Sequence, residues 1–197
     1  MKPAYQVIRA TTTDLRARCR ALVTQYHSYI QWADRPSRKL YWLLQIKGVD
    51  VGVFGLASVF NRNGAVKEYM QTHALGFNEV ANNIVYCLAP NLPPNSGSRF
   101  LSMCRKDAVG WWKERYGDSL RCFQTFILPP RTGAVYKADN WQYIGLTTGT
   151  GFKMITLYGD DPRKIQAERR VFKSGEEKYL YRIASQTPPK LIFMRLA

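Results

Sequence analysis

The sequence has few of the side chains that bind metals or form disulfide scaffolds. Only two histidines and four cysteines occur among 197 residues, and no two cysteines form a C-x-x-C pair. A dedicated zinc cluster is therefore not expected, although the sequence leaves open whether a metal assists. We expect the cysteines to be buried free thiols of a protein in the reducing cytoplasm. No signal peptide and no apolar run of membrane-spanning length is found, so no membrane partner is expected.

Acidic residues are also scarce, with 14 aspartates and glutamates against 29 lysines and arginines and a net charge of +15. A domain this basic usually binds a polyanion, and nucleic acid is the partner we favour. A generally basic soluble protein is the alternative. The hydrophobic content of 46% and the length fit one folded domain with a core of its own.

The most informative stretch begins at a polar turn, N-S-G-S at 95–98, which precedes a helix predicted at about 98–116. Free backbone N–H groups at such a helix start can hold an anion. The same residues also serve as ordinary helix caps, and that alternative stays open. The turn lacks the second glycine and the lysine of a P-loop, which excludes that motif.

Apolar periodicity predicts alternating helices and strands along the chain. The helices are expected at 14–30, 98–116 and 134–140, and residues 66–82 show little pattern beyond a short helix near 77–81. The strands are expected at 5–9, 40–46, 51–59, 84–89, 120–128, 141–147, 152–158 and 179–184. Residues 152–158 either extend the main sheet or pair outside it. From 159 onward the composition becomes basic, which indicates either a DNA-facing extension or an ordinary solvated hairpin.

A second informative stretch, Y-K-A-D-N-W, directly follows a predicted strand and loop. It places a phenol, an amide and an indole close together, where ligand sites of open α/β sheets tend to lie. The alternative is that Tyr136 and Trp141 are simply core aromatics.

The runs P-N-S-G-S-R-F-L, T-F-I-L-P-P and G-A-V-Y-K-A-D-N-W-Q-Y-I-G-L-T-T-G resemble the Mom family of phage DNA-modification proteins. They are also similar to a family of defence-system proteins with a Y-x-A-x-N-W-x-x-x-G-x-T-x-G run. Both are variants of the GNAT acyltransferase fold. The resemblance implies an α/β fold with a central mixed, mostly antiparallel sheet flanked by helices over 1–158. A basic C-terminal extension, 159–197, is expected to pack on the same domain.

Mom proteins convert adenine to an N6-carbamoylmethyl form in double-stranded DNA. The resemblance therefore implies a transferase that adds a small group to an exocyclic amine of phage or prophage DNA, in the host cytoplasm, and protects that DNA from restriction. The donor would be acetyl-CoA or another acyl-CoA. Its diphosphate would be held by Asn95, Ser96, Gly97, Ser98 and Arg99.

The resemblance also implies catalytic residues. Tyr136 matches the place of a tyrosine that protonates the departing thiolate in GNAT enzymes, and Ser98 matches the Mom pattern as well. His27 lies in a Y-H-S segment similar to the family's H-Y-S segment, with an ordinary structural histidine as the alternative. Asp139 is a local carboxylate that could replace an aspartate that the family carries elsewhere.

The base to be modified would have to leave the base stack of the double-stranded DNA, and aromatic side chains would then stack on it. Basic side chains would bind the DNA phosphates. The residues expected to contact DNA are Trp32, Arg35, Arg38, Lys39, Arg131, Lys137, Asn140, Trp141, Arg163, Lys164, Arg169 and Arg170.

The chain departs from the family pattern at two places. Leu128 follows the T-F-I strand where the family often has an aspartate, and the family's central-strand arginine has no match in N-N-I-V-Y-C. These differences put the carbamoylmethyl chemistry in question. The alternatives are a non-catalytic DNA-binding relative and a GNAT acyltransferase that acts on another amine.

Overall fold

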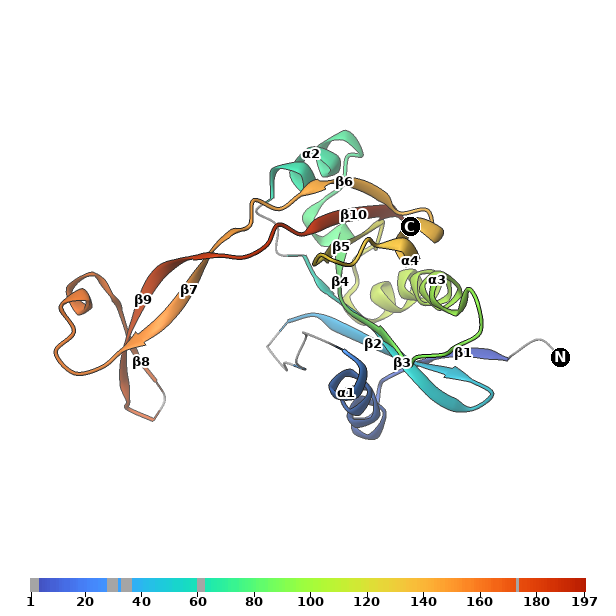
Figure 1. The fold of residues 1–197 in the computed structure, drawn as a ribbon, viewed down its shortest axis with the longest axis horizontal. Coiled ribbons are helices and arrows are strands. Elements are labelled where there is room, and N and C mark those ends of the chain that lie inside the picture. Colours follow the sequence, from blue (N-terminus) through green and yellow to red (C-terminus); the bar gives the residue numbers. More distant parts are fainter. Residues whose placement is uncertain (1–3, 28–31, 33–36, 60–62, 173) are drawn as a thin grey trace. The chain divides into compact units, whose positions relative to one another are not determined.

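The computed structural model describes residues 4–27, 32, 37–59, 63–172 and 174–197. Within these residues the chain forms two compact units, which we call the main unit (Met1–Leu146 with Leu191–Ala197) and the arm (Thr147–Lys190). The main unit contains a seven-stranded sheet with the order β1-β2-β3-β4-β5-β10-β6 (Figure 1). Its elements are β1 (Tyr5–Arg9), α1 (Thr13–Tyr26), β2 (Lys39–Ile46), β3 (Val49–Ser58), α2 (Gly64–Thr72), η1 (Phe77–Glu79), β4 (Val80–Leu88), α3 (Ser96–Tyr116), β5 (Cys122–Ile127), α4 (Ala134–Ala138), β6 (Gln142–Leu146) and β10 (Leu191–Leu196).

The sheet is antiparallel except where β4 and β5 pair in parallel. The expected mixed, mostly antiparallel sheet flanked by helices is therefore confirmed. The apolar run after Pro188-Pro189, for which no strand was predicted, becomes β10. It lies between β5 and β6 and pairs with both.

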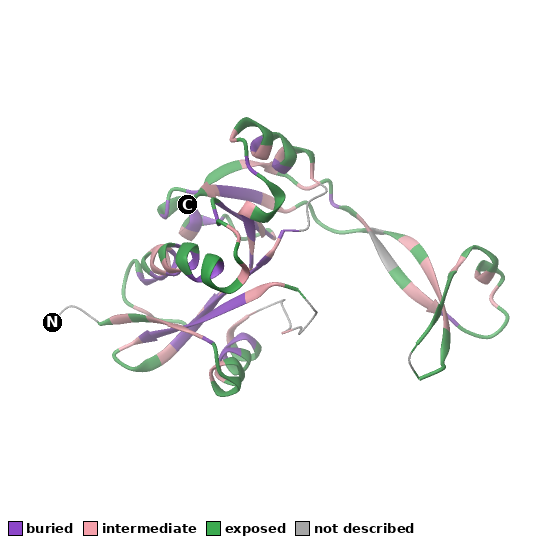
Figure 2. Ribbon diagram, turned by 180° about the vertical axis from the view of Figure 1, so that it is seen from behind, coloured by how far each residue is buried: buried purple, intermediate pink, exposed green. Residues whose placement is uncertain are grey.

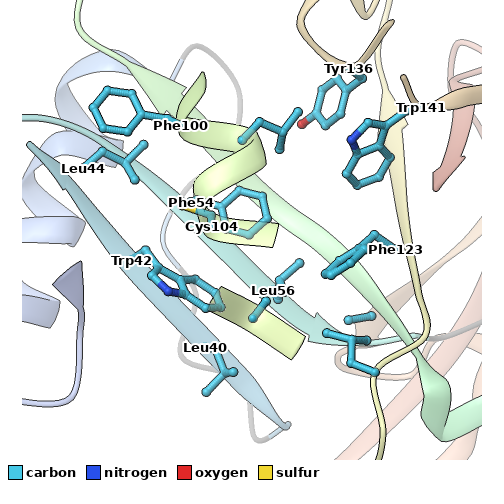
Figure 3. Close-up of a cluster of buried hydrophobic side chains, with 14 of the residues drawn as sticks. Leu40, Trp42, Leu44, Phe54, Leu56, Phe100, Cys104, Phe123, Tyr136 and Trp141 are labelled. Atoms are coloured by element: carbon cyan, nitrogen blue, oxygen red, sulfur yellow. The ribbon is translucent and has the colours of Figure 1, made fainter. Parts of the chain in front are cut away.

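Successive residues of β2 point to opposite faces of the sheet, and each face is covered by a helix. Trp42 and Leu44 pack with the buried side of α3, whereas Tyr41 and Leu43 pack with α1. Figure 3 shows Trp42, Leu44 and Phe54 around Cys104 of α3. Figure 2 shows that buried positions follow the strands of the main sheet. Both layers therefore depend on the alternation of apolar side chains along β2 and β3.

The segment 66–82 has more regular structure than its sequence indicated. Asn63 accepts hydrogen bonds from the N–H groups of Ala65 and Val66 and so caps α2. Val66 and Tyr69 then bury the apolar side of this helix against β5 and β10. The first helix ends at Tyr26, not at 30, because His27 already has extended backbone angles.

All four cysteines are buried and free, as expected. Burial raises the pKa of Cys19 and of Cys122 to about 12, and that of Cys87 to about 11. These thiols are therefore protonated and poorly reactive at neutral pH.

The arm is a three-stranded antiparallel sheet with the order β7-β9-β8. Its elements are β7 (Thr150–Leu157), η2 (Pro162–Gln166), β8 (Glu168–Val171) and β9 (Glu177–Gln186). Residues 152–158 thus pair outside the main sheet. The units divide at 146/147 and 190/191, whereas a boundary at 158/159 was expected, because β7 pairs with β9 and β10 returns to the main sheet.

Candidate functional site

A cavity opens where the two central parallel strands separate. β4 and β5 pair only from Val80 opposite Cys122 to Asn83 opposite Thr125, and β4 then continues to Leu88 paired with β3 but not with β5. A register shift at Gly55/Leu56 of the neighbouring β3 accompanies the separation. The cavity has a volume of about 450 Å³, and we call it the splay cavity. It is lined by His27, Asn83, Ile84, Val85, Tyr86, Thr125, Phe126, Ile127, Pro130, Arg131, Thr132, Gly133, Ala134, Val135 and Tyr136.

Helix α3 begins with backbone donors that no side chain caps. Asn95 precedes it in the left-handed conformation, with φ of 64°. The hydroxyls of Ser96 and Ser98 donate to the carbonyls of Pro93 and Asn95, at 2.6 and 3.3 Å. Within the described part of the chain, no hydrogen bond is recorded from the N–H groups of Gly97 and Ser98. Together with the positive end of a long helix dipole, these donors can hold an anion.

Two tyrosines hold this helix start in place. The Tyr5 hydroxyl lies 2.9 Å from the Ser96 Oγ, and the guanidinium of Arg99 lies over the Tyr5 ring, 4.4 Å from its centroid. The hydroxyl of Tyr86, a splay-cavity residue, donates to the Gly97 carbonyl. The helix start and the splay cavity are therefore directly connected through Tyr86.

The Tyr136 hydroxyl donates to Asn83 Oδ1 at 2.6 Å, and both residues are more than nine-tenths buried. The amide nitrogen of Asn83 donates to the carbonyls of Gly55 and Val85, at 2.8 and 2.9 Å. Asn83 was not predicted as a site residue. The signal for it was a polar residue inside the otherwise apolar strand N-N-I-V-Y-C.

Asp139 lies beside this cluster but does not line the splay cavity. Its carboxylate accepts hydrogen bonds from the buried Arg105 at 3.1 Å and from the Trp141 indole at 2.9 Å. The Trp141 ring in turn packs edge-on against Tyr136, with centroids 5.1 Å apart (Figure 3). In this arrangement Asp139 and Trp141 join α4 to α3, and the indole is a core side chain.

His27 lines the splay cavity although it follows α1 in the chain. Burial lowers its pKa, and the positive charge of Arg131 lowers it further. The imidazole is therefore neutral at pH 7 and able to accept a proton. His27, Tyr136 and Arg131 are the predicted site residues that the fold brings to one cavity.

The other predicted DNA contacts of the main unit are dispersed. The Trp32 ring lies tilted against the Tyr41 ring, with centroids 4.3 Å apart, and Arg38 pairs with Asp118. Lys39 is half-buried at the start of β2, while Lys137 and Asn140 are exposed at the end of α4. Arg35 lies outside the described residues.

The four predicted contacts of the arm all have partners within the arm. Arg163 pairs with Asp161, Arg169 with Glu177, and Arg170 with Glu168. Lys164 donates to the Gly159 carbonyl. The positive charge of this region is thus partly balanced by its own carboxylates.

No group of three His, Cys, Asp or Glu side chains that could hold a metal ion occurs among the described residues. No helix in the described ranges is long and apolar enough to cross a membrane.

The architecture is similar to that of solved acetyltransferases. Arabidopsis thaliana NAA60, solved in complex with acetyl-CoA, matches with a TM-score of 0.55 at 9% identity, over 98% of each chain. This is the GNAT fold. The GNAT architecture is also found in the ribosomal-protein-S18-alanine N-acetyltransferase from Escherichia coli, with a TM-score of 0.50 at 12% identity over 98% of this chain and 94% of that one. FeeM, an N-acyl amino acid synthase from uncultured soil microbes, matches with a TM-score of 0.50 at 10% identity, over 99% of this chain and 92% of that one.

Sequence comparison adds nothing to this structural likeness. No protein-family model matches the chain. No curated protein matches it either.

Proposed function

We propose that this protein is a GNAT acyltransferase that transfers a small acyl-type group from an acyl-CoA to an amine. The observation that carries the proposal is the splay cavity, which is walled by Tyr136 and joined through Tyr86 to the uncapped start of α3. The site thus combines anion-binding donors with a cavity between diverging strands. One of the GNAT structures similar to this chain holds acetyl-CoA, which agrees with such a donor.

The residues present fit a CoA diphosphate. The N–H groups of Gly97 and Ser98 and the guanidinium of Arg99 would bind its oxygens, since all three lie in the first turn of α3. Beyond Asn83 the backbone of β4 still pairs with β3 but no longer with β5, so the polar groups on its β5 side would be available to the amides of a pantetheine arm. The bound donor would supply an acyl carbon activated as a thioester.

In this proposal the acceptor nitrogen attacks the acyl carbon, and the carbon–sulfur bond breaks. The neutral His27 accepts the proton that the amine loses. The Tyr136 hydroxyl gives its proton to the leaving thiolate. Because that proton now points at Asn83, the hydroxyl has to turn away from Asn83 for this step.

The acceptor we propose is an exocyclic amine of double-stranded DNA, with adenine N6 as the first candidate. No carboxylate occurs among the described residues that line the splay cavity, while Arg131 does. Such a cavity suits a neutral amine that is part of an anionic molecule better than it suits a protonated, positively charged amine. The net charge of +15 and the resemblance to the Mom family support DNA, and protection of phage or prophage DNA from restriction would be the biological result.

Mass spectrometry of nucleosides from plasmid DNA, in cells that express the chain or its Tyr136→Phe variant, tests this proposal. We expect a new adduct with the unaltered chain that is lost with the variant. Calorimetry with acetyl-CoA and CoA gives a second, independent readout. CoA binding without an adduct would mean another amine as acceptor, and salt-sensitive DNA binding without CoA binding would mean a non-catalytic DNA-binding relative.

A further inference from the structure

A second cavity, of about 240 Å³, lies at the β1 side of the main sheet. We call it the β1–α3 cavity, and its lining residues are Ala10, Thr11, Arg16, Lys39, Leu40, Tyr41, Trp111, Glu114 and Arg115. It shares no residue with the splay cavity. On α3 it uses the last two turns, whereas the proposed diphosphate site uses the first, roughly 25 Å away at 1.5 Å per residue.

The wall of this cavity is strongly positive. Arg16, Lys39 and Arg115 come from three different elements and line the same small space. The one carboxylate of the lining, Glu114, is held by Arg9 at 2.8 Å. Three cations around one cavity repel each other, and an anion bound between them would attract all three and offset that repulsion.

Part of the lining is held in position by contacts within the protein. Arg16 Nε donates to the Ala10 carbonyl at 3.3 Å, which holds this side chain against the end of β1. The Tyr116 hydroxyl donates to the Lys39 carbonyl at 3.0 Å and accepts from the Lys39 N–H at 2.8 Å, so β2 is tied to the end of α3. Leu40 and Trp111 are buried and form an apolar base. A side chain held in this way, as that of Arg16 is, loses little entropy when it binds a ligand.

We propose that the β1–α3 cavity binds a phosphate group. Two guanidinium groups and an ammonium offer donors to several oxygens of one tetrahedral oxyanion, which suits phosphate better than a planar carboxylate. The phosphate belongs either to a free ion or to a nucleic-acid backbone. In the second case the cavity is an anchor that positions DNA and reads no sequence, far from the reacting base.

The test uses the full chain with Arg16→Gln and Arg115→Gln combined. The matched control combines Arg20→Gln and Lys113→Gln, which remove the same charge from α1 and α3 outside the cavity. Circular dichroism in phosphate-free buffer checks that both variants fold. Thermal unfolding is then compared with inorganic phosphate and with chloride at equal ionic strength, and the affinity for a short duplex is measured at several salt concentrations.

If the site takes free phosphate, phosphate raises the melting temperature of the unaltered chain and of the control by more than that of the cavity variant, in which the start of α3 is still intact. If it takes backbone phosphate, the cavity variant binds duplex about tenfold more weakly and its log–log salt slope falls by about 1, with little change in the control. Equal effects in both variants, or no effect in either experiment, would overturn the proposal. Because both variants leave the splay cavity unaltered and neither readout needs CoA, the comparison between them is independent of the proposed acyl transfer.

Discussion

The hydroxyl of Tyr136 donates its hydrogen to Asn83 Oδ1, and the direction of this bond is set by two backbone carbonyls. The Asn83 amide nitrogen already donates to Gly55 and Val85, so only its oxygen can face the phenol. The Asn83 side chain thus links Tyr136, the proposed proton donor, to β3 at Gly55, where the pairing register of β3 shifts.

Replacing Tyr136 with phenylalanine should leave the buried Asn83 oxygen without its donor. We expect a loss of about 1–3 kcal/mol in the free energy of unfolding, because an unpaired buried acceptor is costly. Urea denaturation measures this loss, and CoA affinity should stay nearly unchanged. An unchanged stability would mean that the hydrogen bond to Asn83 is not maintained in solution.

Gly97→Ala should weaken CoA binding. A Cβ at this position would lie 2.8 Å from Val135 Cγ2, so the first turn of α3 or the start of α4 has to shift. Gly110→Ala is the matched control in the same helix, since nothing lies within 4 Å of its added Cβ. There we expect a gain of up to about 1 kcal/mol in stability and no change in CoA affinity measured by calorimetry. Equal CoA affinity in the two variants would contradict the proposed position of the diphosphate.

Arg105→Met should strongly destabilise the main unit, because the Asp139 charge stays buried without its partner. Breaking a buried ion pair from one side typically costs about 3–5 kcal/mol. Chemical denaturation measures the free energy of unfolding of this variant and of a control, Lys106→Met, at the exposed neighbouring position. The control should change that free energy by no more than about 0.5 kcal/mol. Similar values for the two variants would show that the pair with Asp139 contributes little.

Asp107 predicts a pH dependence. Partial burial raises its pKa, but hydrogen bonds from Arg9 and Trp42 outweigh this, so the pKa lies below its ordinary value of 3.8. Because this pKa is lower in the folded than in the unfolded state, the Asp107 carboxylate stabilises the fold at pH values above its unfolded-state pKa. That contribution is lost as the pH falls through the folded-state pKa. The stability difference between the unaltered chain and Asp107→Asn should be constant at neutral pH and shrink below about pH 4. A difference that does not vary with pH would exclude this charge effect.

Removal of the arm should leave the main unit folded. Leu146 and Leu191 are directly opposed in the β6–β10 ladder, so an Asn-Gly turn can replace Thr147–Lys190. We expect one cooperative thermal transition and unchanged CoA affinity, together with weaker duplex binding if the arm contacts DNA. A second variant that only neutralises Arg163, Lys164, Arg169 and Arg170 separates charge from shape. Loss of folding on deletion would show that the arm is required by the main unit.

Local sequence signals predicted most elements of the main unit. The helix expected at 98–116 is α3, since its apolar spacing and its Asn-Ser-Gly-Ser start are both local features. The strand order and the place of β10 could not be predicted, because a short apolar run does not reveal its partners. β8 and η2 were missed since short exposed segments carry no apolar periodicity.

The site was predictable only in part. The polar turn and the Y-K-A-D-N-W run pointed to the helix start and to Tyr136, because their residue types are unusual in a plain core. The pairing of Asp139 with Arg105 depends on how α3 and α4 pack, which no spacing in the sequence encodes. Asn83 likewise gains its role only because β4 leaves β5 at that residue.

The place of β10 also affects synthesis. Among the strands that the structure describes, β6 pairs only with β10, and β10 follows it after the whole arm. At ribosomal speeds of about 5–20 residues per second, β6 emerges roughly 2–10 s before this neighbour exists. Over that interval its edge and that of β5 are open to other chains, so a pause in translation within the arm would prolong the period in which the nascent protein can aggregate.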